Sequence, residues 1–127
     1  MLEFLKGTPW WPAPERWEGA VLCLETSEEA PTVTQVARFL RNYGSQGVLE
    51  RAAALLLARP MRYTAEQRWL LYEAVLRVLA EFDRGDMPVV ANLDFGHTSP
   101  QMVLPFGCLA RVDPARREVV LLEAGVS

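Results

Sequence analysis

The chain has 127 residues, of which half are hydrophobic and 23% are charged, so it can bury one core and is too apolar to be disordered. Its formal net charge of -3, with no dense stripe of lysine and arginine, argues against binding to nucleic acid or to an anionic membrane surface. No apolar run reaches the roughly 20 residues that span a bilayer, and no signal-peptide pattern opens the chain, so we expect a cytoplasmic protein.

The first segment combines stiff and bulky residues. Residues 7–19, GTPWWPAPERWEG, hold three prolines, two glycines and three tryptophans, which predicts an irregular loop whose tryptophans need cover. The short apolar run AVLCLE at 20–25 follows, bounded by Gly19 and by the polar residues TSEE. Such a run is typical of a strand buried on both faces, here ending at Glu25.

Two amphipathic helices are predicted, each opened by a capping-box spacing of threonine and glutamine. The first has Thr32 and Gln35, is expected to end at Gly44, and places these apolar residues on one face: Val33, Val36, Phe39, Leu40 and Tyr43. The second covers residues 64–85, ends near Gly85, and has its predicted apolar face at Trp69, Tyr72, Val75, Leu76, Leu79 and Phe82. Between them, residues 47–60 predict a short helical turn and then a strand around Ala54 to Ala58, with a helical continuation as the alternative.

The last third of the chain is rich in strand signals. MPVVANL at 87–93 predicts a buried strand, and DFGHTSP at 94–100 predicts a loop. Residues 106–125 then predict two strands joined by the tight turn DPAR. The alternation of strands and helices favours an α/β layered domain with a largely parallel sheet, flanking helices and a C-terminal hairpin.

The two cysteines, Cys23 and Cys108, lie far apart in apolar surroundings. We interpret them as buried thiols in a reducing compartment and not as a disulfide or a metal-binding pair.

Glu25 and His97 each follow a predicted strand, and functional groups in open α/β sheets collect beyond the carboxyl ends of strands. His97 is the only histidine of the chain. From the residues alone, His97 has two possible roles. It is either a structural or surface histidine whose ring nitrogens are hydrogen-bonded, or a general base that Glu25 orients. A metal site formed with Asp94 and Glu25 fits less well, because no histidine or cysteine pair stands at ligand spacing.

Four parts of the sequence resemble the LD-carboxypeptidase family of serine peptidases. AVLCLETSEEAPTVTQVARFLRNYG, at 20–44, is similar to the family segment in which a strand ends in a Leu-Glu pair before acidic residues and a helix. ANLDFGHTSPQMVLPFGCLARVD, at 91–113, is similar to its Gly-His segment and the Leu-Pro-aromatic-Gly turn that follows. GTPWWP and ARPMRYT most resemble the branch that contains the microcin C immunity peptidases.

The resemblance implies a swivelling β/β/α domain and a Ser-Glu-His triad in which Glu25 and His97 are the catalytic glutamate and histidine. The family's serine lies in an N-terminal domain within a Gly-aromatic-Ser-Asp segment, which this sequence lacks. No serine of this chain has the pattern of a nucleophile elbow: Ser27, Ser45, Ser99 and Ser127. We therefore expect residues 1–127 to be a single domain equivalent to the family's C-terminal domain, inactive without a nucleophile-bearing partner.

The resemblance further implies hydrolysis of an amide next to a carboxylate-bearing residue, without a metal or other cofactor. The substrate is a murein peptide with an L,D bond or a peptidyl or aminoacyl nucleotide, and Arg59 and Trp10 are candidate substrate contacts. The alternative is a non-catalytic binding or interaction module that keeps the fold. An uncovered aromatic patch around Trp10 and Trp11 would also favour a homo-oligomer.

Overall fold

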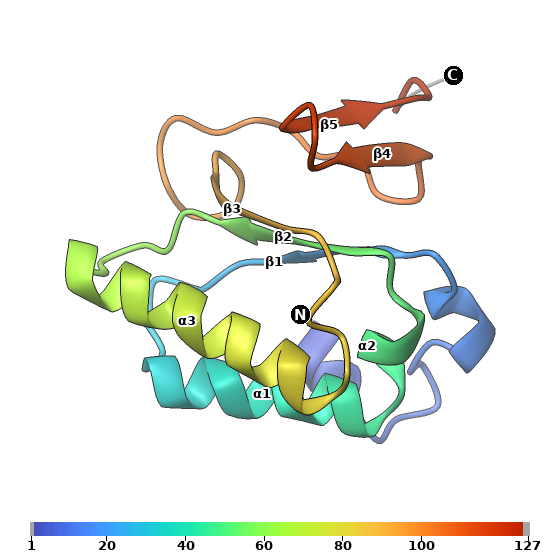
Figure 1. Ribbon diagram of the computed structural model, residues 1–127, viewed down its shortest axis with the longest axis horizontal. Coiled ribbons are helices and arrows are strands. Elements are labelled where there is room, and N and C mark those ends of the chain that lie inside the picture. Colours follow the sequence, from blue (N-terminus) through green and yellow to red (C-terminus); the bar gives the residue numbers. More distant parts are fainter. Residues whose placement is uncertain (1, 126–127) are drawn as a thin grey trace.

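The computed structural model describes residues 2–125, which form three layers (Figure 1). The middle layer is a parallel sheet in the order β1-β2-β3, with these bounds: β1 Val21–Leu24, β2 Ala54–Ala58 and β3 Val89–Leu93. Helices cover one face of the sheet: α1 Val33–Ser45, α2 Val48–Arg51 and α3 Ala65–Glu81. An antiparallel hairpin lies over the other face: β4 Ala110–Asp113 and β5 Glu118–Leu121.

These layers confirm the predicted α/β class, with its parallel sheet, flanking helices and terminal hairpin. Residues 54–58 form a strand, so the helical alternative for this segment is wrong. Within residues 2–125, no helix combines the length and apolar character needed to cross a membrane.

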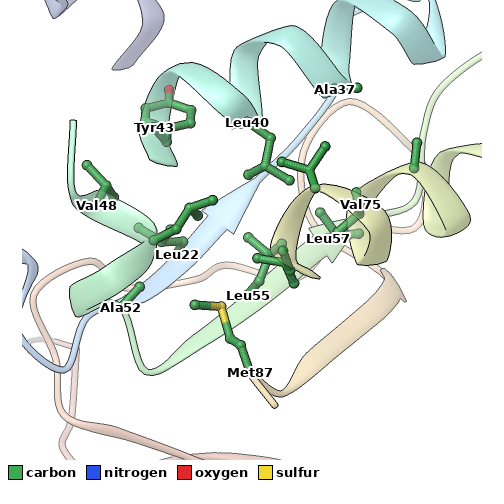
Figure 2. Packing of buried hydrophobic residues seen from close by; sticks show 14 of the residues in the cluster. Leu22, Ala37, Leu40, Tyr43, Val48, Ala52, Leu55, Leu57, Val75 and Met87 are labelled. Atoms are coloured by element: carbon green, nitrogen blue, oxygen red, sulfur yellow. The ribbon is translucent and has the colours of Figure 1, made fainter. Parts of the chain in front are cut away.

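The central strand β2 joins two hydrophobic clusters, because all its residues are buried. Leu55 and Leu57 point toward the helices, where they pack with Leu40 and Val75 (Figure 2). Leu56 and Ala58 belong to a smaller cluster between the sheet and the hairpin. Burial on both faces explains why this segment is continuously apolar instead of alternating with polar residues.

Both predicted capping boxes are present at the starts of α1 and α3. In α1, the Gln35 amide donates to the Thr32 hydroxyl at 3.2 Å, and the Thr32 amide donates to the Gln35 side chain at 2.8 Å. The expected end at Gly44 is wrong, since α1 continues to Ser45. Glycine is needed there for packing, because an ideal Cβ would lie 2.4 Å from the Phe82 ring.

The buried face of α3 differs from the predicted one. Trp69 and Leu76 were expected to face the core, but they are 65% and 55% exposed. The residues that are buried are Leu71, Ala74, Val75, Val78 and Leu79. Small side chains such as Ala74 let the helix approach α1 and the sheet closely, whereas the Trp69 ring would hold it away.

The N-terminal tryptophans divide into two inward rings and one exposed ring. Trp17, at the end of a 3₁₀ turn over Pro14–Trp17, is 7% exposed. Trp11 packs between Trp17 and Tyr43, with ring centroids 5.4 and 6.1 Å away, whereas Trp10 is 77% exposed. A second 3₁₀ turn covers Leu2–Leu5, so the expected irregular loop is flanked and interrupted by short turns.

Cys23 and Cys108 are both free and half-buried, which is less burial than the sequence predicted. Cys23 lies with the cluster under the hairpin. Burial raises the pKa of the Cys23 thiol, and a thiol that stays protonated is a poor nucleophile.

Strand β3 contains a bulge close to its carboxyl end. Leu56 and Ala58 of β2 pair with Val90 and Leu93, so three steps along β3 match two along β2. Asn92 accommodates the extra residue in a left-handed conformation, with φ of 63°. Asparagine tolerates this region better than most residues. The bulge sets the direction in which the chain leaves β3 toward residues 94–100.

We predict that Asn92→Ala lowers the free energy of unfolding by about 1 kcal/mol, because alanine resists the left-handed conformation. Asn92→Gly should leave stability nearly unchanged. The control is Asn42→Ala on α1, where the same replacement gains helix propensity and should not destabilise. Urea unfolding followed by circular dichroism measures all three, and equal effects of alanine at positions 92 and 42 would refute backbone strain at the β3 bulge.

Candidate active site

The parallel sheet brings Glu25 and His97 together. Glu25 directly follows β1, and His97 lies in the loop after β3; both strands run parallel to β2, so both segments leave the same edge of the sheet. The Nδ1 atom of His97 lies 3.0 Å from Oε2 of Glu25. The two side chains are 44% and 40% exposed, so the pair faces solvent.

Gly96 makes this contact possible. Its φ of +88° is in the region that favours glycine, and an ideal Cβ would lie 2.0 Å from Oε2 of Glu25. Any larger residue would displace either the carboxylate or the loop. The glycine before His97 therefore allows the β3 loop to cross close to the Glu25 side chain.

Arg59 ties the end of the central strand to the histidine loop. Its Nη2 atom lies 2.6 Å from Oδ1 of Asp94, and its Nε donates to the Thr98 hydroxyl at 3.3 Å. A further contact of 3.3 Å joins Nη2 to the Pro100 carbonyl oxygen. Arg59 thus lies at the predicted edge, but it is paired within the chain, and Asp94 is engaged with Arg59 instead of joining Glu25 on His97.

A second carboxylate at His97 was not anticipated from the sequence. Oε2 of Glu28 lies 3.1 Å from Nε2, the ring nitrogen on the side away from Glu25. Glu28 belongs to a turn in which the Ala30 amide donates to the Ser27 carbonyl at 3.0 Å. The acidic pair Glu28 and Glu29 was the available signal, but only the turn determines which of the two reaches the ring.

Trp10 lies away from these residues. Its neighbour Trp11 packs on Tyr43, in the last turn of α1. The chain then enters β1 beside α2, where the Gly19 amide donates to the Arg51 carbonyl at 3.0 Å. This is the amino edge of the sheet, so the structure does not bring Trp10 to Glu25 and His97.

The serines within residues 2–125 do not complete a triad. No hydroxyl in this part of the chain hydrogen-bonds to the His97 ring, whose recorded partners are the Glu25 and Glu28 carboxylates. Ser45 ends α1 at the opposite edge of the sheet, and Ser127 lies outside the described residues. An imidazole bound by a carboxylate at Nδ1 can act as a base through Nε2.

Comparison with known proteins identifies the family. A model of the LD-carboxypeptidase C-terminal domain matches residues 1–112. The Synechocystis sp. protein named "Putative carboxypeptidase slr1534" is 29% identical over 110 residues, which are 84% of this chain and 34% of that protein.

Solved structures of similar proteins have the same fold as this chain. An MccF-like protein from Streptococcus pneumoniae, in complex with AMP, has a TM-score of 0.72 and 28% identity over 94% of this chain and 33% of its own. The microcin C7 self-immunity protein MccF, in complex with aspartyl sulfamoyl adenosine, has a TM-score of 0.78 and 22% identity over 99% of this chain and 36% of its own. The chain spans about a third of the length of these relatives. It belongs to the LD-carboxypeptidase C-terminal domain family.

Proposed function

We propose that this chain supplies the general base and the orienting carboxylate of a Ser-Glu-His hydrolase, whose serine comes from a separate nucleophile domain. The observation that carries the proposal is the 3.0 Å contact between His97 Nδ1 and Glu25 Oε2 at the carboxyl edge of the sheet. Membership of the LD-carboxypeptidase C-terminal domain family supports it. The exposure of the pair also supports it, because it leaves His97 and Glu25 open to contact by a further domain.

In this mechanism, His97 Nε2 takes the proton of the serine hydroxyl as the serine oxygen attacks the amide carbonyl. The imidazolium then protonates the leaving amine, which breaks the C–N bond and leaves an acyl-enzyme. Water, deprotonated by the same nitrogen, attacks the acyl-enzyme and releases the acid and the free serine. Glu25 holds the Nδ1–H tautomer and stabilises the imidazolium formed in each step.

The proposed substrates have an amide next to a carboxylate-bearing residue, in a murein L,D-peptide or in an aminoacyl nucleotide. The second class is supported by the ligands of two relatives, AMP and aspartyl sulfamoyl adenosine. The nucleophile domain is the proposed partner, because the matched relatives are about three times as long as the region they share with this chain.

The first prediction from this proposal uses a chimera in which this chain replaces the matching third of the Synechocystis relative. The isolated chain should not hydrolyse either substrate class, whereas the chimera should hydrolyse one of them. His97→Ala and Glu25→Gln should each lower kcat by a factor on the order of 10⁴, because the triad acts as a unit. The measurement is steady-state kinetics of amide hydrolysis.

Glu29→Gln is the matched control for this prediction, since it removes an exposed carboxylate of the same segment. It should leave kcat unchanged. Full activity in the His97→Ala chimera would contradict the triad. A folded chimera that binds an aminoacyl nucleotide analogue with no turnover would favour the binding module.

The second prediction concerns Gly96. Gly96→Ala in the chimera should lower kcat by roughly 100-fold, because the methyl group would push His97 and Glu25 out of their contact. Gly107→Ala is the control: its φ of +78° carries similar backbone strain, but within residues 2–125 no atom beyond its two chain neighbours lies within 4 Å of the added Cβ. Equal kcat values for the two variants would show that the close approach at Gly96 does not matter.

The third prediction separates two roles of Arg59. If Arg59 positions the His97 loop, Arg59→Ala should lower kcat by about tenfold or more with little change in KM. Arg111→Ala, which removes an exposed arginine paired with Glu118 in the hairpin, should change neither value. A raised KM with unchanged kcat would instead identify Arg59 as a contact for the substrate carboxylate or phosphate.

A further inference from the structure

The side of His97 that must meet the nucleophile is already in contact with Glu28. A general base must lie about 2.6–3.2 Å from the oxygen whose proton it takes. Oε2 of Glu28 lies 3.1 Å from His97 Nε2, within that range. A serine oxygen and the Glu28 carboxylate would therefore compete for the same nitrogen.

The hydrogen-bonding chemistry of a carboxylate determines what the Glu28 contact does to Nε2. An ionised carboxylate only accepts hydrogen bonds. When Glu25 holds the proton on Nδ1, a neutral ring presents a lone pair at Nε2, which repels the Glu28 oxygen. The imidazolium carries a proton on both nitrogens and attracts both carboxylates. The Glu28 contact therefore requires a proton on Nε2, and a nitrogen that already carries a proton cannot take one from a serine.

The backbone of Glu28 is held by a hydrogen bond, whereas its side chain is largely exposed and free to change rotamer. Its carbonyl oxygen accepts from Nη1 of Arg62 at 3.0 Å, and its side chain is 59% exposed. At the same edge, Arg59 engages Asp94 at 2.6 Å and not Glu28. The carboxylate of Glu28 can therefore rotate away from His97 while the turn that carries it stays in place.

We propose that Glu28 is a latch on His97: its carboxylate holds Nε2 in the isolated domain and gives way when the nucleophile domain places its serine there. The latch rests on the proposed triad. Glu28 is thereby a residue of the same site that acts through His97.

The test uses diethyl pyrocarbonate on the isolated chain. This reagent transfers an ethoxycarbonyl group to a neutral imidazole nitrogen and releases carbon dioxide and ethanol. Because His97 is the only histidine, the ultraviolet absorbance of the histidine adduct reports on it alone. At pH 6, Glu28→Gln should react roughly three- to fivefold faster than the wild type, because the carboxylate contact that occupies Nε2 is lost. Glu29→Gln is the control and should react at the wild-type rate.

Equal rates for wild type, Glu28→Gln and Glu29→Gln would overturn the latch. Glu28→Ala adds a check, because an increase in that variant alone would mean that Glu28 only shields the ring sterically, which also contradicts the proposal. Circular dichroism confirms that each variant is folded. The reaction needs no serine and no substrate, so its outcome is independent of whether the chimera hydrolyses an amide.

Discussion

The candidate site depends on one constraint, the parallel pairing of β2 with both β1 and β3. Since β2 is buried on both faces, a change of register would move its leucines out of both clusters. The fixed register brings the ends of β1 and β3 to one edge. Glu25 and His97, 72 positions apart in the sequence, meet there at 3.0 Å. The helices and the hairpin stabilise this sheet, and the sheet in turn positions the pair.

Local patterns were enough to predict the parts of the fold that neighbouring residues determine. The Thr-x-x-Gln spacings predicted both helix starts, because each capping box is closed by residues three positions apart. The apolar run at 54–58 indicated the central strand. The edge that holds Glu25 and His97 followed from strand and helix alternation, together with the resemblance to LD-carboxypeptidases.

What the sequence could not predict depends on contacts between distant elements. The buried face of α3 was misplaced because the packing of Ala74 against α1 and the sheet, and not the size of Trp69, decides which side faces inward. The pairing of Arg59 with Asp94 and the reach of Glu28 to His97 each require the exact course of a loop. Sequence periodicity carries no information about the course of a loop. The sequence therefore predicted that Arg59 lies at this edge of the sheet, but not that it pairs with Asp94.

The most direct measurement is a crystal structure of this chain joined to the nucleophile domain of a family member. It should place the serine oxygen about 2.6–3.2 Å from His97 Nε2, with Glu25 still on Nδ1 and the Glu28 carboxylate turned away. A serine far from Nε2, or a His97 ring that has left Glu25, would contradict a catalytic role for this pair.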